Sequence, residues 1–409
     1  MRRVIVVVLL AVLGLTACST SPEASSKELV VVVNAPLSKT PYVGSTIHQG
    51  VQLAVDQINA KGGIDAGGGQ TYRLRVEALD NALSPQQALD NVRKAVADKA
   101  IAIVDEGTGL DASWQIAAAA NLPICIVYQG GVGLVDPTAR PNVFRVAPTD
   151  HGIAFRYAEY LIPKGMKVAL MHDDSDYGQK GRAALQEAFG SNPEAVAADL
   201  TVTAGAADPA PSVLEARRTG ATALLVWGQA ATIAGVLRAA RTSGWDVPVF
   251  TPPTGADPLI RQQLADHPDW VDGLTFASGR MTAERGSKPF LTFQSAYQKA
   301  FGADEVGVKT AGGHSVIQPP EFAMYAYDFV HVLAEAVATA HGPDPVALMD
   351  ALNQVDVRGA NGDERGFNEK NHEGVVDDDV YFAVFSDMTF APVKDDPLSS
   401  TLDVIDQTA

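Results

Sequence analysis

The chain has 409 residues, of which 46% are hydrophobic and 19% charged, so it is long enough to form two domains of ordinary size. Its formal net charge is −17 and its Lys and Arg residues are scattered, which argues against nucleic-acid binding. The chain has 2 cysteines, Cys18 and Cys125, too few for a disulfide framework, and Cys125 lies in an apolar segment typical of a core.

The N-terminal segment is typical of an export signal. Basic residues (MRR) precede the apolar run Val4–Leu15, which is too short to span a bilayer. The run ends in LTAC, and small residues before Cys18 resemble the lipobox of bacterial lipoproteins, which implies cleavage before Cys18 and its lipidation. An ordinary signal peptide with an incidental cysteine is the alternative. We predict a lipoprotein signal peptide at 1–17 and a polar tether at 18–27.

The next part of the chain alternates short apolar segments with helix-length segments. Leu29–Val33 (LVVVV) is rich in β-branched residues and is expected to form a strand buried on both faces. A helix is expected at Ser45–Lys61, with Ser45 as its N-cap. Further elements are expected at 72–79, 85–98, 101–104, 111–120 and 123–127. This alternation predicts βαβ units and a parallel sheet.

Two Gly-rich turns follow neighbouring strands of this predicted sheet. The turn Glu106–Gly109 (EGTG) follows strand 101–104, and the turn Tyr128–Gly131 (YQGG) follows strand 123–127. Ligands bind just past the carboxyl ends of the strands in open parallel sheets. We therefore expect the two turns to form one side of a ligand cleft.

The same alternation begins again after residue 150. Strands are expected near 167–171, 195–201, 222–227, 247–251 and 380–385. One helix is expected after the turn at 172–178 and up to about residue 189, and others near 209–219, 230–243, 289–301 and 319–341. In the last of these helices, residues such as Phe322 and Tyr325 lie at helical spacing. Core packing explains this spacing better than an aromatic ligand site.

Several segments carry a family resemblance. They are PLSKTPYVG, GVQLAVDQINAKGGI, the D…SPQQA segment that begins at Asp80, FRV-PTD at 144–150 and MHDDSDYG at 171–178. In this order they resemble the type I periplasmic binding proteins of the branched-chain amino-acid transport family. INAKGGI is the most specific piece, and the resemblance extends over about residues 28 to 390.

The resemblance implies an α/β fold with two Rossmann-like lobes, each with a parallel sheet, joined by a three-segment hinge. Lobe 1 is expected at 28–147 and 278–366, and lobe 2 at 148–277 and 367–390. Residues 391–409 are expected to form an acidic, polar C-terminal tail.

The resemblance also implies where a ligand binds. The first lobe would contribute Tyr42 and the two Gly-rich turns, and the second lobe would contribute residues after its strands. Simple packing at element ends is the alternative for Tyr177 and Trp227. The implied ligand-binding residues are Tyr42, Gly107, Thr108, Gly109, Tyr128, Gln129, Gly130, Tyr177, Trp227, Gln229 and Thr254.

The motifs of common enzymes are missing from the sequence. It has no G-x-S-x-G, P-loop or G-x-G-x-x-G motif, and His372-Glu373 lacks the second histidine of a zinc protease because Val376 stands there. The acidic turn 172–176 (HDDSD) fits a helix N-cap better than a calcium site. We expect a protein that is not an enzyme, with no catalytic residue, metal or cofactor.

The predicted ligand is a small organic solute. Amino-acid binders of the resembled family have an acidic residue near Thr254 that receives the ammonium group, and threonine cannot replace its charge. Asp105 or Glu106 could substitute, and amides or aromatic carboxylates are alternative ligands. We expect an extracytoplasmic binding protein, attached to the membrane through lipidated Cys18, that delivers its ligand to the permease subunits of an ABC importer. The alternative is a ligand-sensing receptor module of the same fold that acts on a signalling partner.

Overall fold

The computed structural model describes residues 27–204, 208–279, 288–302, 307–309, 315–317, 321–376, 379–386 and 389–401. The predicted signal peptide, Cys18 and the tether up to residue 26 lie outside the described residues. Within the described part of the chain, no helix is both long and apolar enough to cross a membrane.

The first sheet has the strand order β2-β3-β1-β4-β5-β6, and its strands are parallel except for the antiparallel pair β2–β3. The chain passes from β1 to β3 and then to β4 on the other side of β1, so the carboxyl ends of β1 and β4 flank a switch point, the usual ligand position in such sheets. The strands are β1 (Lys27–Ala35), β2 (Ile64–Asp65), β3 (Thr71–Asp80), β4 (Ala102–Asp105), β5 (Ile124–Ile126) and β6 (Val143–Arg145). The helices between them are α1 (Pro41–Ala60), α2 (Pro85–Ala97) and α3 (Leu110–Ala118).

The second sheet has the order β17-β16-β11-β10-β9-β7-β8 and a corresponding switch point between β7 and β9. The pairs β11–β16 and β16–β17 are antiparallel, so both sheets are mixed although mainly parallel. The strands are β7 (Val168–Asp173), β8 (Val196–Val202), β9 (Ala223–Trp227), β10 (Val249–Thr251), β11 (Leu274–Ser278), β16 (Tyr381–Ser386) and β17 (Thr389–Pro392). The helices are α4 (Asp150–Leu161), α5 (Asp176–Phe189), α6 (Ala210–Arg218), α7 (Ala230–Thr242) and α8 (Pro258–Gln263).

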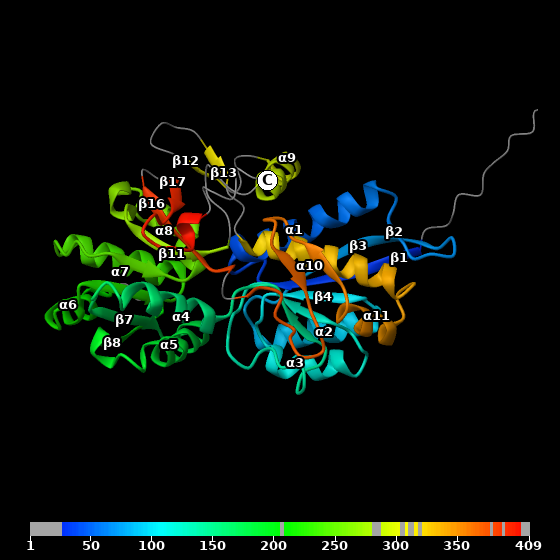
Figure 1. The fold of residues 1–409 in the computed structure, drawn as a ribbon, viewed down its shortest axis with the longest axis horizontal. Coiled ribbons are helices and arrows are strands. Elements are labelled where there is room, and N and C mark those ends of the chain that lie inside the picture. Colours follow the sequence, from blue (N-terminus) through cyan, green and yellow to red (C-terminus); the bar gives the residue numbers. More distant parts are fainter. Residues whose placement is uncertain are drawn as a thin grey trace, which may run out of the picture.

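Between β11 and β16 the chain returns to the first sheet, where α9 and α10 pack against α1. Figure 1 shows α10 and α11 beside the strands of the first sheet, in the half of the molecule opposite β7 and β8. The elements of this part are α9 (Lys288–Phe301), β12 (Gly307–Lys309), β13 (Ser315–Ile317), α10 (Glu321–Thr339), α11 (Pro345–Leu352), β14 (Asp356–Arg358) and β15 (Glu364–Gly366).

Each sheet has its own apolar core because its strands are buried on both faces. Val33 of β1 and Phe329 of α10 lie in one core cluster of the first half, whereas Leu224 of β9 and Ile233 of α7 lie in one core cluster of the second half. Separate cores allow each half to hold its shape when the two move relative to each other.

The chain crosses between the two sheets three times. The first connection, between β6 and α4, and the third, between β15 and β16, lie side by side. The backbone N–H of Arg145, at the end of β6, donates to the carbonyl of His372 (2.9 Å), and the N–H of Gly374 donates to the carbonyl of Arg145 (2.7 Å). The rings of Phe144 and His372 stack with centroids 4.1 Å apart. The two connections therefore form one bonded unit between the two sheets.

The α/β fold with two sheets is confirmed, with two differences in detail. The first is that the sheets are mixed, since β2 pairs antiparallel with β3 in the first sheet, and β16 and β17 are antiparallel in the second. The second is that α1 begins at Pro41 rather than after Ser45, so Tyr42 lies in the first turn of this helix and not in a loop. Proline is favoured in the first turn because it lacks the N–H that would have no partner there.

The described part of the C-terminal segment packs against the second sheet. Asp396 is buried and accepts two hydrogen bonds of 3.0 Å from Arg156 Nη2. The buried Ser399 hydroxyl accepts from the backbone N–H of Phe382 in β16 (2.7 Å). Residues 389–401 are thus an integral part of the second half, whereas residues 402–409 lie outside the described part.

Candidate ligand-binding cleft

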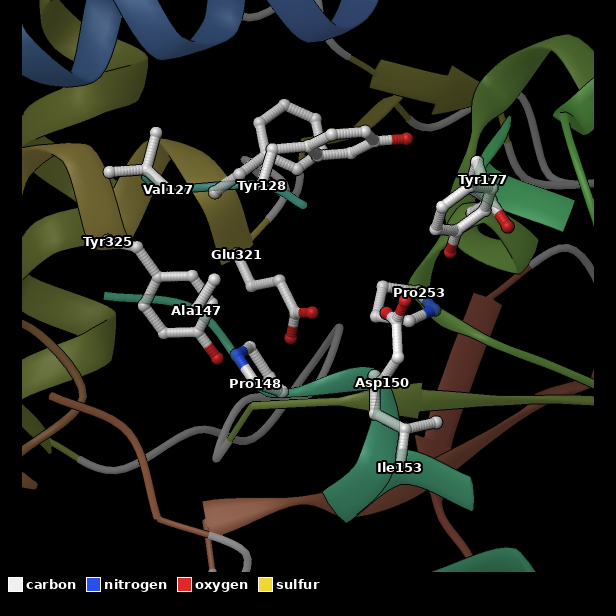
Figure 2. Close-up of a pocket in the computed structure, with 12 residues that line it drawn as sticks. Val127, Tyr128, Ala147, Pro148, Asp150, Ile153, Tyr177, Pro253, Glu321 and Tyr325 are labelled. Atoms are coloured by element: carbon white, nitrogen blue, oxygen red, sulfur yellow. The ribbon is translucent and has the colours of Figure 1, made fainter. Parts of the chain in front are cut away.

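A small cavity lies between the two sheet-bearing halves. Its volume is about 20 Å³, which is room for about one water molecule, so the halves approach each other closely in this conformation. Figure 2 shows side chains from both halves converging on it. The polar and aromatic side chains that line it are Tyr128, Glu321, Phe322 and Tyr325 from the first half, and Asp150, Tyr177 and Thr254 from the first connection and the second half.

Aromatic rings bring the two halves together at this cavity. The rings of Tyr128, after β5, and Tyr177, at the start of α5, are stacked with centroids 6.4 Å apart. Phe322 of α10 meets the edge of Tyr128 at 5.3 Å and that of Tyr42 at 5.6 Å. Burial raises the pKa of Tyr42 well above its usual value, and the neighbouring carboxylate of Asp257 in the other half adds to this shift.

Two carboxyl groups line the cavity. Asp150 begins α4 and is 2% exposed, and Glu321 begins α10 and is 5% exposed. Burial is the main cause that raises the pKa of Asp150 to about 7 and the pKa of Glu321 to about 8, because a buried carboxylate loses hydration. The Gly279 N–H donates to Glu321 Oε2, which opposes the shift.

In the second half, Tyr177 and Thr254 line the cavity, and contacts with buried residues hold both in place. The Thr254 hydroxyl donates to the Gly228 carbonyl (3.0 Å), which holds the turn after β10 against the end of β9. Trp227 is fully buried and lies behind Tyr177, with ring centroids 6.1 Å apart. The structure places Trp227 beneath Tyr177 and outside the cavity wall.

Asp105 and Glu106, which follow β4, are buried and bonded within the first half. Asp105 accepts from Asn34 Nδ2 (2.7 Å) and the Gly107 N–H (2.6 Å). Glu106 accepts from Asn81 Nδ2 (3.0 Å), the Thr108 N–H (3.0 Å) and Gln129 Nε2 (3.3 Å). Burial raises the pKa of Asp105 to about 7 and also raises the pKa of Glu106. Neither carboxyl group lines the cavity, so the structure does not support either as the expected substitute at Thr254.

The other residues of the two Gly-rich turns support this hydrogen-bond network and bond to the first connection between the sheets. Gly107 has φ +119°, and a Cβ there would lie 2.7 Å from the Gln129 side chain, so glycine is required. Thr108 and Gly109 are half-buried in the same turn. The Gln129 carbonyl accepts from Arg145 Nη1 (3.2 Å), and the Gly130 carbonyl accepts from the Asp150 N–H (2.9 Å).

The acidic turn after β7 stabilises helix ends. Asp173 accepts from the Gln229 N–H (2.8 Å) and the Thr232 hydroxyl (3.0 Å) at the start of α7, and Ser175 caps α5. Gln229 is the N-cap residue of α7, and it is not among the residues that line the cavity. Among the described residues, no group of three or more metal-ligating side chains occurs.

The structure thus brings three of the expected ligand residues to the cavity wall, namely Tyr128, Tyr177 and Thr254. Tyr42 does not line the cavity but contacts Phe322, which does. Sequence reasoning missed Asp150, Glu321, Phe322 and Tyr325. Asp150 belongs to the PTD segment used for the family resemblance, which was the available signal. Phe322 and Tyr325 are buried as expected for core residues, yet they also line the cavity.

Comparison with known proteins gives a family match over most of the chain. Residues 33–394 match the model of a family described as periplasmic binding protein. The chain is 25% identical over 371 residues, 85% of each chain, to the Leu/Ile/Val-binding protein homolog 8 of Brucella suis.

Two solved structures show the same fold. The branched-chain amino acid transporter substrate binding protein from Streptococcus pneumoniae, in complex with isoleucine, has a TM-score of 0.73 at 23% identity, over 89% of this chain and 98% of that one. A solute binding protein of an ABC transporter from Rhodopseudomonas palustris, in complex with 3,4-dihydroxy benzoic acid, has a TM-score of 0.70 at 19% identity, over 89% and 95%. Similar folds therefore hold chemically different ligands.

Proposed function

Since the chain belongs to the periplasmic binding protein family, we propose that it is the substrate-binding protein of an ABC importer. The family consists of solute-binding proteins without enzymatic activity. The ligand we propose is a small organic solute, first of all a branched-chain amino acid, because similar proteins are named for binding leucine, isoleucine and valine.

The observation that carries this proposal is that the cavity draws its wall from both halves. Tyr128 comes from the first half and Tyr177 and Thr254 from the second, so a ligand that contacts all three stabilises the closed form over the open form. We propose lobes at 28–147 and 278–366 and at 148–277 and 367–390, with the described residues 391–401 moving with the second. A permease can then distinguish the loaded protein from the empty one by its closure.

We also propose that the protein acts outside the cytoplasm, attached to the membrane through lipidated Cys18. The residues that support this attachment are the basic start, the short apolar run and the LTAC sequence. Residues 19–26 would serve as a polar tether between the anchor and β1.

A thermal-shift screen of the domain from residue 26 onward tests ligand binding. The panel contains leucine, isoleucine, valine, small amides and 3,4-dihydroxybenzoate. A ligand at 100 times its dissociation constant adds about 2.7 kcal/mol to the native state, enough to raise the midpoint by several degrees. We expect a shift with a branched-chain amino acid that is lost in Tyr177→Ala. If no compound of any class gives a shift, the proposed solute binding is wrong.

A further inference from the structure

The cavity wall has an unusual charge balance. Asp150 and Glu321 supply two carboxyl groups, and none of the described lining residues is a lysine, arginine or histidine. The rest of the wall is apolar or aromatic, with Tyr128, Tyr177 and Tyr325 among its rings. Carboxylates next to the faces of aromatic rings are the surroundings that organic cations prefer.

Asp150 has an oxygen with no hydrogen-bond partner among the described residues. This atom, Oδ2, is buried, and Asp150 as a whole is 2% exposed. Buried polar atoms are nearly always hydrogen-bonded, so an orphaned carboxylate oxygen on a cavity wall is an acceptor that a donor group in the cavity, such as that of a ligand, can satisfy. Figure 2 shows the Asp150 side chain among the residues of the wall.

In the described part of the chain, the cations that act on Asp150 are paired with other carboxylates. Arg145 makes a two-bond ion pair with Glu373 at 2.7 and 2.5 Å. Lys180 lies 2.8 Å from Asp176 within α5. Both attract the Asp150 carboxylate at longer range, but neither supplies a hydrogen bond to it.

Among the described residues, the cation that acts on Glu321 is Arg365, and it is engaged in the same way. Arg365 is fully buried and pairs with Asp328 and Asp379, each at 3.2 Å. Within the ranges that the structure describes, Glu321 therefore has its Gly279 hydrogen bond and the neighbouring Tyr325 hydroxyl, but no cation of its own. Burying a carboxylate without a cation is unfavourable in free energy, and this applies to both Asp150 and Glu321.

We propose that the cleft binds its ligand through a protonated amino group held between Asp150 and Glu321. The ligand is thus a primary ammonium compound, such as an amino acid or an alkylamine, and its ammonium group is received here instead of at Thr254. Because the cavity now has room for about one water molecule, the two halves must separate to admit the ligand. The ammonium group then donates to Asp150 Oδ2, and the rings of Tyr128 and Tyr177 cover the adjoining part of the ligand. This inference rests on the proposed solute binding and adds the ligand's charge and the residues that receive it.

Three probes with one carbon skeleton test the inference by calorimetric titration of the intact mature protein. They are L-leucine, 3-methylbutylamine, which lacks the carboxylate, and 4-methylpentanoate, which lacks the amino group. Other amino acids, amines and 3,4-dihydroxybenzoate complete the panel. We expect binding of compounds with an ammonium group, and at least tenfold weaker binding of the matching carboxylate.

Variants locate the charge interaction. Asp150→Asn and Glu321→Gln should each weaken binding of the ammonium probe at least tenfold. Asp396→Asn is the matched control, since Asp396 is an equally buried carboxyl group whose partners Arg156 and Ser399 lie outside the cavity, and it should bind like the wild type. The unfolding midpoint of each variant without ligand shows whether it is folded.

The possible outcomes separate this inference from the proposed function. If a carboxylate or amide binds and no ammonium compound does, the ammonium site is wrong and the proposed solute binding stands. The ammonium site is also wrong if leucine binds equally well to folded Asp150→Asn and Glu321→Gln. If no probe binds at all, both proposals fail.

Discussion

Arg145 and Glu373 join the first and third connections between the halves through a two-bond ion pair. Arg145 Nε lies 2.7 Å from Glu373 Oε2, and Arg145 Nη2 lies 2.5 Å from Glu373 Oε1. The Arg145 side chain is 3% exposed and the Glu373 side chain 23%. Arg145 also donates to the carbonyls of Gln129 and Gly131, so one guanidinium links the hinge to the turn that presents Tyr128.

Replacing Glu373 with glutamine should destabilise the protein, because a buried guanidinium loses its charged acceptors. We expect a loss of about 1–3 kcal/mol in the free energy of unfolding, measured by denaturant titration. The exposed two-bond pair Arg238–Asp266 gives a matched control, and Asp266→Asn should change the midpoint little. Equal effects of the two substitutions would show that burial of Arg145 is unimportant.

The sequence was sufficient to predict the elements whose signal is local. Buried strands such as β5, β7 and β10 are marked by apolar runs. Tyr128, Tyr177 and Thr254 follow the carboxyl ends of these strands, where the family resemblance placed ligand residues, and all three line the cavity. The start of α1 was wrong because Ser45 was chosen as the N-cap over Thr40-Pro41, where proline sets the first turn.

Glu321 and Asp150 could not be placed on the cavity from the sequence alone. Glu321 reaches it because α10 packs on α1 far along the chain, and no local pattern specifies that contact. Asp150 resembles an ordinary residue of a helix start, with Thr149 as the N-cap. The same limit applies to Tyr325, since helical spacing predicts burial but not which buried face adjoins a cavity.

Gly181 of α5 allows Trp227 to support Tyr177. A Cβ at Gly181 would lie 2.2 Å from Trp227 Nε1, whereas alanine in a helix normally stabilises by about 0.5–1 kcal/mol over glycine. We expect Gly181→Ala to destabilise the protein by about 1–3 kcal/mol, as overpacking does, and to weaken ligand binding through Tyr177. Gly235→Ala in α7 is the control, because its nearest contact would be Pro209 Cγ at 3.3 Å. Unchanged stability in Gly181→Ala would contradict the tight packing of the Trp227 ring.

Replacement of Cys18 should release the protein from the membrane. In the producing cells, Cys18→Ser is expected to move the protein from the membrane fraction to the soluble fraction and to abolish incorporation of a labelled fatty acid. Cys125→Ser is the control, because Cys125 is buried in β5 and should leave both readouts unchanged. Labelling of the Cys18→Ser protein would disprove the proposed anchor.

Stability without ligand should fall as the pH rises from 6.5 to 8. The pKa of Asp105 and of Asp150 is about 7 and that of Glu321 about 8 in the native state, against about 4 in an unfolded chain. The native state therefore keeps protons that the unfolded state has lost, and the unfolding free energy decreases with pH by an amount on the order of 1–3 kcal/mol over this range. Buried His331, with its pKa lowered to about 4 from 6.5, acts in the opposite direction, mostly below the range measured and weakly at its lower end.

Denaturant titrations at four pH values measure this slope. Glu321→Gln should make the dependence shallower, since glutamine can still accept from the Gly279 N–H but does not titrate. A wild-type stability that rises between pH 6.5 and 8 would show that these carboxyl groups ionise as easily in the native state as in the unfolded chain.

Binding of 3-methylbutylamine should release protons and become tighter as the pH rises. An ammonium group favours the ionised forms of Asp150 and Glu321, whose pKa values in the free protein are about 7 and about 8. The described groups that act on these carboxyls are Arg145, Lys180 and Asp176 for Asp150, and Arg365 and Tyr325 for Glu321, and none is a histidine.

Calorimetry in two buffers of different ionisation enthalpy counts the released protons. We expect the affinity to rise at least tenfold from pH 6 to 8 and then to level off, because an alkylamine stays protonated up to about pH 10. Glu321→Gln should lower the proton count, and an affinity independent of pH in the wild type would mean that the carboxyl groups do not receive the amine.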